Sequence, residues 1–124
     1  MKINGMEVES PDRLPPIIPG CKSCRGEEFR PSCYLKDLNE IGACRICVVE
    51  VVRAKTLVTA CVYPVNEGME IYTNSPRVMK ARKMTLELML STHDKKCLSC
   101  VRSENASCRS CAVTTAWRTS TPLR

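Results

Sequence analysis

The sequence predicts an α+β fold with a small core, in which several short strands precede one helix and a cysteine-rich tail. Three observations support this prediction. β-Branched residues dominate the apolar runs before residue 75, a run with helical spacing follows them, and aromatic residues make up only 4% of the chain. Because so aliphatic a core is small, 124 residues with 10 cysteines favour a fold stabilised by metal or by disulfides.

The strands are predicted in four places. Residues 2–9, KINGMEVE, form a predicted hairpin because Asn4-Gly5 is a strong two-residue turn signal. The proline-rich segment 10–20, SPDRLPPIIPG, is expected to be neither a regular helix nor a central strand. Further strands are predicted at CVVEVV (47–52), TLVTACV (56–62) and MEIYT (69–73), of which the first two form a second hairpin.

One helix is predicted to begin after Ser75, which suits the N-cap, with Pro76 at the first helical position. The helix is expected to end near Ser91. Its buried face is predicted from residues at helical spacing, which are Val78, Ala81, Thr85, Leu88 and Met89. The basic run RVMKARK (77–83) is interpreted as a solvated face, or as a docking face for an acidic partner.

The composition favours metal binding in a reducing compartment. The segment MKINGMEVES lacks the apolar stretch of a signal peptide and no apolar run reaches membrane-spanning length, so a cytoplasmic location without a membrane span is expected. In that compartment, clustered cysteines bind metal more often than they form disulfides. The net charge of +6 admits a nucleic-acid partner, but none is expected because no aromatic stacking set accompanies the scattered basic residues.

Four cysteines define a C-x10-C-x2-C-x13-C pattern, namely Cys33, Cys44, Cys47 and Cys61. Four thiolates suit zinc or an iron–sulfur cluster. Structural zinc sites usually use two close pairs, whereas here only the second and third cysteines are close. Plant-type [2Fe–2S] ferredoxins share a layout in which one loop supplies three ligands and a strand end the fourth. Gly42 and Ala43 should allow backbone amides to approach the sulfurs and donate hydrogen bonds to them.

Three segments carry a resemblance to a known family: CYLKDLNEIGACRICVVEV (33–51), TACVYPVNEGMEIYTNSPRV (59–78) and ARKMTLELMLSTHDKKCLSC (81–100). They resemble the N-terminal region of [FeFe]-hydrogenase catalytic subunits, of the large iron–sulfur subunit of NADH-quinone oxidoreductase, and of some NAD-dependent formate dehydrogenases. The resemblance is closest to the hydrogenase branch around residues 34–51. It implies a β-grasp [2Fe–2S] ferredoxin-like domain whose cluster is held by Cys33, Cys44, Cys47 and Cys61.

A second cysteine group follows the predicted helix. His93, the only histidine, begins HDKKCLSC, which has the spacing H-x3-C-x2-C. In the resembling family, H-x3-C-x2-C-x5-C holds a [4Fe–4S] cluster, so the resemblance implies that His93, Cys97 and Cys100 are ligands of such a cluster. The fourth ligand is expected at position 106, which is Ala106, and Cys108 is the candidate substitute.

The tail after Asn105 is rich in Ser, Thr and Arg without a helical period, and we interpret it as out-of-frame translation. A shifted reading of plausible codons for NASCRSCAVTTAWRT gives CELQKLCRDYGVED, which restores a cysteine at the expected spacing. A similar shift of PGCKSCRGEE gives LAASPAGVK, so Cys21 and Cys24 are expected to bind nothing specific. The predicted division is a ferredoxin-like domain over 1–74, a helix with a partial His-Cys motif over 75–105, and an irregular tail over 106–124.

The predicted function is single-electron transfer within a larger oxidoreductase, most similar to an iron hydrogenase subunit, and no catalysis by this chain alone is expected. An NADH-quinone oxidoreductase or a formate dehydrogenase is the alternative parent. The predicted partners are other subunits or domains of a redox complex, a ferredoxin or an NAD(P)H-linked flavoprotein.

Two other function classes remain open. The first is a zinc-binding interaction module, which rests on a C-x2-C-x7-C-x2-C pattern formed by Cys97, Cys100, Cys108 and Cys111. The second is an enzyme with a cysteine nucleophile, for which His93 is the one histidine available as a base.

Overall fold

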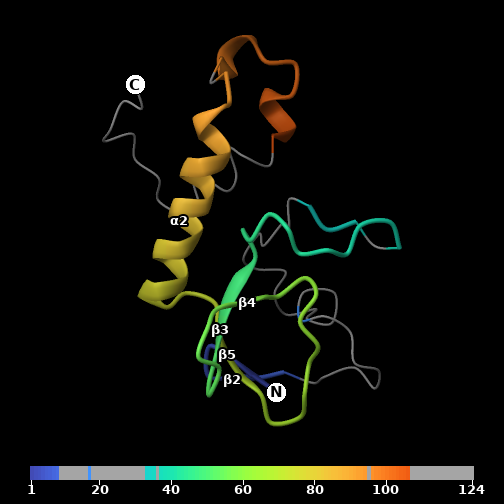
Figure 1. Cartoon of the computed structure of the whole chain (residues 1–124), viewed down its shortest axis with the longest axis vertical. Helices are drawn as coiled ribbons and strands as arrows, with labels where there is room; N and C mark the ends of the chain where they lie inside the picture. Colours follow the sequence, from blue (N-terminus) through green and yellow to red (C-terminus); the bar gives the residue numbers. More distant parts are fainter. Residues whose placement is uncertain (9–16, 18–32, 36, 95, 107–124) are drawn as a thin grey trace.

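The structure, a computed structural model, describes residues 1–8, 17, 33–35, 37–94 and 96–106. Within these residues a five-stranded sheet is followed by the helix α2, Pro76–Ser91, and by two short 3-10 helices, Cys97–Ser99 and Ser103–Asn105. The helix rises from the sheet towards the 3-10 segments (Figure 1). The predicted α+β class is therefore confirmed. Among the described helices, none has both the length and the apolar character needed to cross a membrane.

The sheet is mixed, and its strand order is β2-β1-β5-β3-β4. The strands are β1 (Lys2–Ile3), β2 (Met6–Glu7), β3 (Val48–Val51), β4 (Val58–Thr59) and β5 (Glu70–Tyr72). β1 runs parallel to β5, and the other neighbouring pairs are antiparallel. The hairpin predicted at the start of the chain is confirmed, since Asn4 and Gly5 have φ of 50° and 85°, as a two-residue turn with both φ positive requires.

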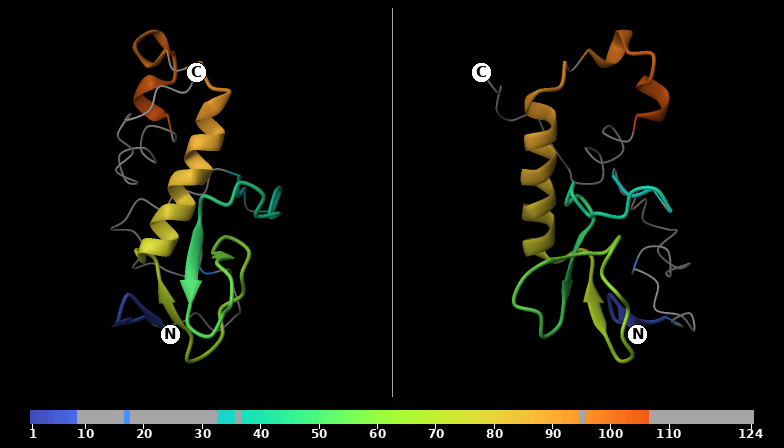
Figure 2. Two further views of the ribbon diagram at one scale, coloured as in Figure 1. Left: turned by 60° about the vertical axis from the view of Figure 1, so that its left-hand side comes forward. Right: turned by 45° about the vertical axis from the view of Figure 1, so that its right-hand side comes forward.

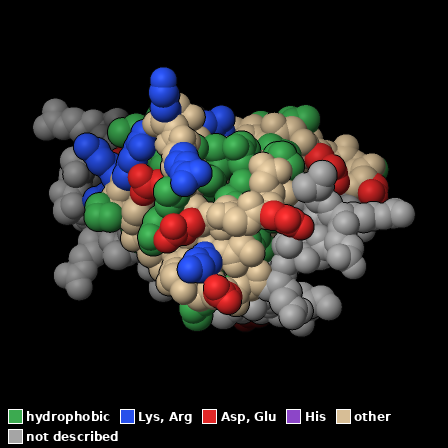
Figure 3. All heavy atoms as spheres, turned by 90° about the horizontal axis from the view of Figure 1, so that it is seen from below, with side chains coloured by type: hydrophobic (Ala, Val, Ile, Leu, Met, Phe, Trp, Pro, Cys, Tyr) green, Lys and Arg blue, Asp and Glu red, His purple; other side chains and the backbone are tan. Residues whose placement is uncertain are grey.

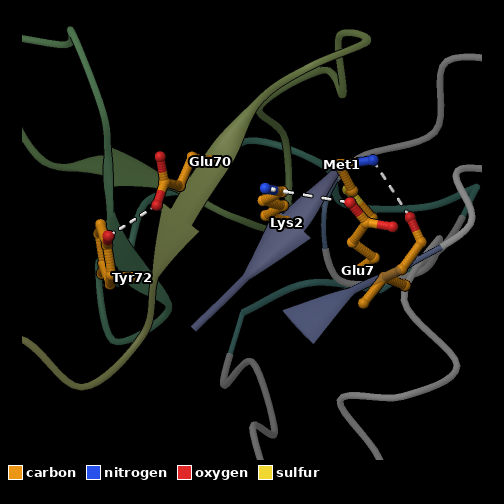
Figure 4. Close-up of polar contacts among 6 residues, drawn as sticks. Met1, Lys2, Glu7, Glu70 and Tyr72 are labelled. Carbon is orange, nitrogen blue, oxygen red and sulfur yellow. Dashed lines mark hydrogen bonds and ion pairs between the residues drawn. The ribbon is translucent and has the colours of Figure 1, made fainter. Parts of the chain in front are cut away.

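Polar contacts hold the N-terminal edge of the sheet together (Figure 4). The amino group of Met1 donates to the carbonyl of Val8 at 3.1 Å, and the Lys2 ammonium lies 3.9 Å from the Glu7 carboxylate across the hairpin. The Lys2–Glu7 pair is exposed, so it stabilises the hairpin by no more than about 1 kcal/mol. The buried side chain of Ile3, paired with Ile71 across the parallel strands, anchors this edge more firmly.

The strand β3 is covered on both faces, which explains why three of its four residues are valines. Val49 and Val51 face a core cluster that also contains Ile3, Ile17, Ala60, Val65 and Ile71. Val48 and Glu50 face α2, which lies alongside β3 (Figure 2). A strand buried on both faces reads as a continuous apolar run rather than as an alternating one.

The strand predicted over 56–62 is shorter than expected, because β4 covers only Val58–Thr59. The amides of Val62 and Tyr63 both donate to the carbonyl of Thr59, at 3.2 and 3.0 Å. This turn takes the chain out of the sheet before Cys61. The proline-rich segment lies outside the described residues except for Ile17, which is 2% exposed and whose amide donates to the Tyr63 carbonyl at 3.2 Å.

The ends of α2 are as predicted. The Ser75 hydroxyl accepts a hydrogen bond from the Val78 amide at 3.3 Å, Pro76 begins the helix, and Ser91 ends it.

The predicted buried face of α2 is wrong except at Val78. Leu88 and Met89 are 69% and 36% exposed, and the fully buried residues are Val78, Arg82, Leu86 and Leu90. Ala81 and Thr85 are half-buried. The true face follows an i, i+4 repeat, and the charged Arg82 in that repeat conceals it from a hydrophobic count.

The run RVMKARK is solvated in part. Its exposed members are Arg77, Lys80 and Lys83. On the face of the molecule seen in Figure 3, most of the Lys and Arg side chains gather on one side. Arg82 contradicts the prediction, since it is only 4% exposed. Its Nε and Nη2 donate to the Val48 carbonyl at 3.3 and 2.9 Å, so this side chain points towards the sheet and not into solvent.

Candidate metal centre

The segment 33–47, which we term the cysteine loop, carries three of the four predicted [2Fe–2S] ligands and extends beside the sheet (Figure 1). It is closed by short-range hydrogen bonds rather than by secondary structure. Leu35 and Asn39 exchange backbone hydrogen bonds at 3.0 and 2.8 Å, and the Asn39 side-chain amide donates to the Cys33 carbonyl at 3.0 Å. These contacts fix Cys33 relative to the rest of the loop.

Positive φ angles turn the backbone of the cysteine loop sharply on both sides of Cys44. Gly42 has φ of 61° and Arg45 has φ of 59°. Arginine rarely adopts this conformation, which costs it about 1 kcal/mol or more, so the surrounding contacts must stabilise the bend. A backbone that turns in this way directs consecutive amide groups towards the enclosed space.

Gly42 also marks the place where the cysteine loop touches the turn after β4. A Cβ atom at this position would lie 3.0 Å from Val62 Cγ2 and 3.1 Å from Thr59 Oγ1. Such distances are shorter than ordinary van der Waals contact, so glycine allows the loop backbone to rest directly on the turn. This close approach holds the cysteine loop against the turn that contains Cys61.

The four cysteines are gathered as two pairs. The Sγ atoms of Cys47 and Cys61 lie 3.3 Å apart, and both residues are completely buried. The Cys44 amide donates to the Cys33 Sγ at 3.3 Å, and these two residues are half-buried. Within the described part of the chain, no group of three or more His, Cys, Asp or Glu side chains is placed to hold one metal ion.

Two pairs of thiols suit a binuclear cluster better than a single ion. A structural zinc site needs four ligands around one point. In a [2Fe–2S] cluster, four cysteines are shared between two irons, and sulfide completes the coordination. All four donors are sulfur, which iron–sulfur clusters prefer.

The surroundings of the thiols shift their pKa values in opposite directions. The pKa of Cys33 lies below its ordinary value, chiefly because the Cys44 backbone amide donates to its sulfur. Burial raises the pKa of Cys44, although a hydrogen bond from the Ile46 amide opposes the shift. The expected hydrogen bonds from loop amides to sulfur are therefore present, and they favour the thiolate form that binds metal.

Cys61 has the most strongly shifted thiol of the site. Its pKa is raised to about 12, chiefly by burial, and the hydrogen bond with Cys47 and the charges of the other site cysteines contribute to the same shift. In the absence of metal this thiol is protonated at neutral pH, so metal binding must release its proton.

The buried face of α2 supports the cysteine loop from one side. Leu86 and Leu90 pack with Ile46, and Cys44 lies against the same cluster. One turn earlier, Arg82 binds the carbonyl of Val48. The alternate residues 44, 46 and 48 of the loop and strand therefore rest on helix positions spaced by four. Sequence reasoning missed this support, and the signal that could have indicated it is the apolar spacing of Val78, Leu86 and Leu90.

The second predicted group is not assembled in the described residues. His93 and Cys100 are exposed and Cys97 is half-buried, and the three do not form a metal-holding group in this part of the structure. They follow α2 on the side away from the sheet (Figure 2). Cys108 lies outside the described residues, as do Cys21, Cys24 and Cys111.

Comparison with known proteins agrees with the geometry of the first site. Residues 20–76 match the family described as the 2Fe-2S iron-sulfur cluster binding domain. The chain is 48% identical over 65 residues to the NADP-reducing hydrogenase subunit HndD of Solidesulfovibrio fructosivorans, an alignment covering 52% of this chain and 11% of that one. It is 37% identical over 98 residues to the NADH-ubiquinone oxidoreductase 75 kDa subunit of Reclinomonas americana, covering 79% and 14%.

A solved structure shows the same fold. A chain in the crystal structure of NAD+-reducing [NiFe]-hydrogenase in the H2-reduced state aligns with a TM-score of 0.79 at 17% identity. The alignment covers 94% of this chain and 48% of that one. At this identity the likeness concerns the fold.

These findings define the class of the matched region: residues 20–76 match a [2Fe–2S] iron–sulfur domain, and the relatives similar to the chain are subunits of a hydrogenase and of an NADH-ubiquinone oxidoreductase. Such a domain is an electron-transfer module of a larger oxidoreductase. The chain spans only 11% to 14% of the length of these two relatives.

Proposed function

We propose that Cys33, Cys44, Cys47 and Cys61 hold the [2Fe–2S] cluster of this domain, and that the chain relays single electrons within a hydrogenase-type enzyme. The observation that carries the assignment is the pairing of the four thiols, with Cys47 and Cys61 3.3 Å apart and fully buried. The bound cluster would supply a centre that accepts and releases one electron.

The two cysteine pairs have different roles in this proposal. Cys47 and Cys61 are shielded from water, which keeps the buried side of the centre dry. Cys33 and Cys44 are half-buried and form the edge nearest to solvent, where an electron partner can approach. The amides of Cys44 and Ile46 donate to sulfur at this edge and stabilise negative charge there, which favours the reduced form.

The proposed parent is an iron hydrogenase subunit, with NADH-quinone oxidoreductase or formate dehydrogenase as alternatives. The higher identity to the NADP-reducing hydrogenase subunit, 48% against 37%, supports this choice. The proposed partners are the other subunits of such a complex and a soluble electron carrier, either an NAD(P)H-linked flavoprotein or a ferredoxin. Free paired thiols suit a reducing compartment such as the cytoplasm.

A second cluster is proposed for the intact parent protein, with His93, Cys97 and Cys100 as ligands and Cys108 as the substitute for the cysteine expected at 106. The H-x3-C-x2-C spacing supports it, because His and Cys are both ligands of iron–sulfur clusters. The proposed frame shift after Asn105 stays a prediction, and genomic sequencing across that codon is its test.

The experiment that tests the function is anaerobic reduction of the cluster-loaded chain, followed by visible absorption. The expected result is a brown protein that bleaches on adding dithionite and regains its colour on oxidation. Cys61→Ser should abolish most of this signal, whereas Cys24→Ser, which replaces a cysteine that the sequence predicts to bind nothing specific, should retain it. A signal lost equally in both variants, or a colourless protein containing zinc, would contradict the proposal.

A further inference from the structure

We propose that Arg82 sets the reduction potential of the cysteine site by holding a permanent positive charge in a buried position beside Val48, the residue that follows Cys47. This inference rests on the proposed function, since it concerns the same four cysteines. It adds a residue that belongs to neither cysteine group and that lies on the helix rather than on the loop.

The position of Arg82 is fixed by its hydrogen bonds. The side chain is 4% exposed, and its Nε and Nη2 both donate to the carbonyl oxygen of Val48. Val48 directly follows Cys47 in the chain. Standard bond lengths therefore place the guanidinium no more than about 12 Å from the Cys47 sulfur.

Packing alone gives no reason for an arginine here. Val78, Leu86 and Leu90 already supply the apolar contacts of the same helix face. A buried guanidinium is costly to desolvate, and replacing buried ionic groups by apolar ones is often neutral or stabilising. Arginine also remains charged at every accessible pH.

The charge has a use if the adjacent centre gains an electron. Dithionite, or the natural one-electron donor, adds one unit of negative charge to the thiolate-bound centre and is itself oxidised. A fixed positive charge stabilises the reduced form more than the oxidised form. At about 12 Å and an effective dielectric constant of ~20, this effect is on the order of tenfold in the equilibrium constant for reduction. For a one-electron couple, tenfold corresponds to about 59 mV.

Three variants separate charge from hydrogen bonding and from folding. Arg82→Gln retains a donor for the Val48 carbonyl but loses the charge. Arg82→Lys retains the charge on a different donor. Lys83→Gln is the matched control, because it removes one positive charge from an exposed position next in the same helix. Each protein is purified anaerobically and its iron and sulfide are counted before its potential is measured by dithionite titration.

The expected result is that Arg82→Gln lowers the midpoint potential, because its equilibrium constant for reduction falls roughly tenfold. The midpoint potentials of Arg82→Lys and Lys83→Gln should stay close to that of the parent chain. Because a buried charge is poorly screened, the difference should persist at ~1 M salt. If Arg82→Gln fails to load the cluster but Arg82→Lys loads it, the charge is required and the inference is supported.

Equal potentials for Arg82→Gln and the parent chain would overturn the inference, as would an equally low potential for Arg82→Lys. If Arg82→Gln and Arg82→Lys both fold but neither loads the cluster, Arg82 has only a packing role, and this result also overturns the inference. If the unsubstituted chain itself binds no iron and sulfide, the proposed function fails first, so the two failures are distinguishable.

Discussion

Replacing Gly42 by alanine should separate the cysteine loop from the turn that carries Cys61. The new Cβ would meet Val62 Cγ2 at 3.0 Å and Thr59 Oγ1 at 3.1 Å, and the backbone has a φ of 61°. The left-handed conformation costs alanine about 1 kcal/mol. Crowding a packed contact adds ~1–3 kcal/mol. The free energy of unfolding should therefore fall by about 2–4 kcal/mol.

The matched control is Gly68→Ala. Gly68 has a φ of 72°, but a Cβ there would meet nothing within 4 Å, so only the backbone cost of about 1 kcal/mol applies. Urea denaturation of the reduced, metal-free proteins measures both values, and iron per chain measures the effect on the site. Gly42→Ala should lose stability and iron, whereas Gly68→Ala should keep its iron. Equal losses in the two variants would refute the close-contact argument.

Three further predictions follow from burial and from the shifted thiols. Burial and the neighbouring cysteines raise the pKa of Cys61 from 9.0 to about 12. The metal-free protein should therefore lose stability as pH rises through that range, by up to about 1.4 kcal/mol per pH unit more than Cys61→Ser does; parallel curves of stability against pH would contradict this. The lowered pKa of Cys33 should make it the fastest of the four site thiols to react with iodoacetamide near neutral pH, as peptide mass spectrometry can show. Leu86→Ala should cost ~2–5 kcal/mol and Leu88→Ala below about 0.5 kcal/mol in denaturation, whereas equal costs would argue against the observed buried face of α2.

Local signals in the sequence were sufficient for much of the fold. Asn4-Gly5 predicted the first turn because few other pairs tolerate two positive φ angles. Ser75-Pro76 predicted the start of α2 because a hydroxyl cap and a residue without an amide suit that position. Both signals depend on a few neighbouring residues, so they survive without knowledge of tertiary contacts.

Features that depend on long-range packing were not predictable in the same way. The buried face of α2 was misassigned because Arg82 belongs to it, and its burial depends on the carbonyl of Val48, 34 residues away. β4 ends early because the following turn closes onto Thr59. The cysteine spacing indicated the candidate site, but the arrangement as two pairs depends on the contact of Gly42 with that turn.

Iron, acid-labile sulfide and zinc counted on one anaerobically purified sample test the central claim most directly. The paired arrangement of Cys33 with Cys44 and of Cys47 with Cys61 predicts at least about two irons, an equal amount of sulfide and no stoichiometric zinc per chain. About one zinc per chain without sulfide would contradict the account, because four cysteines around a single ion cannot remain in two separate pairs.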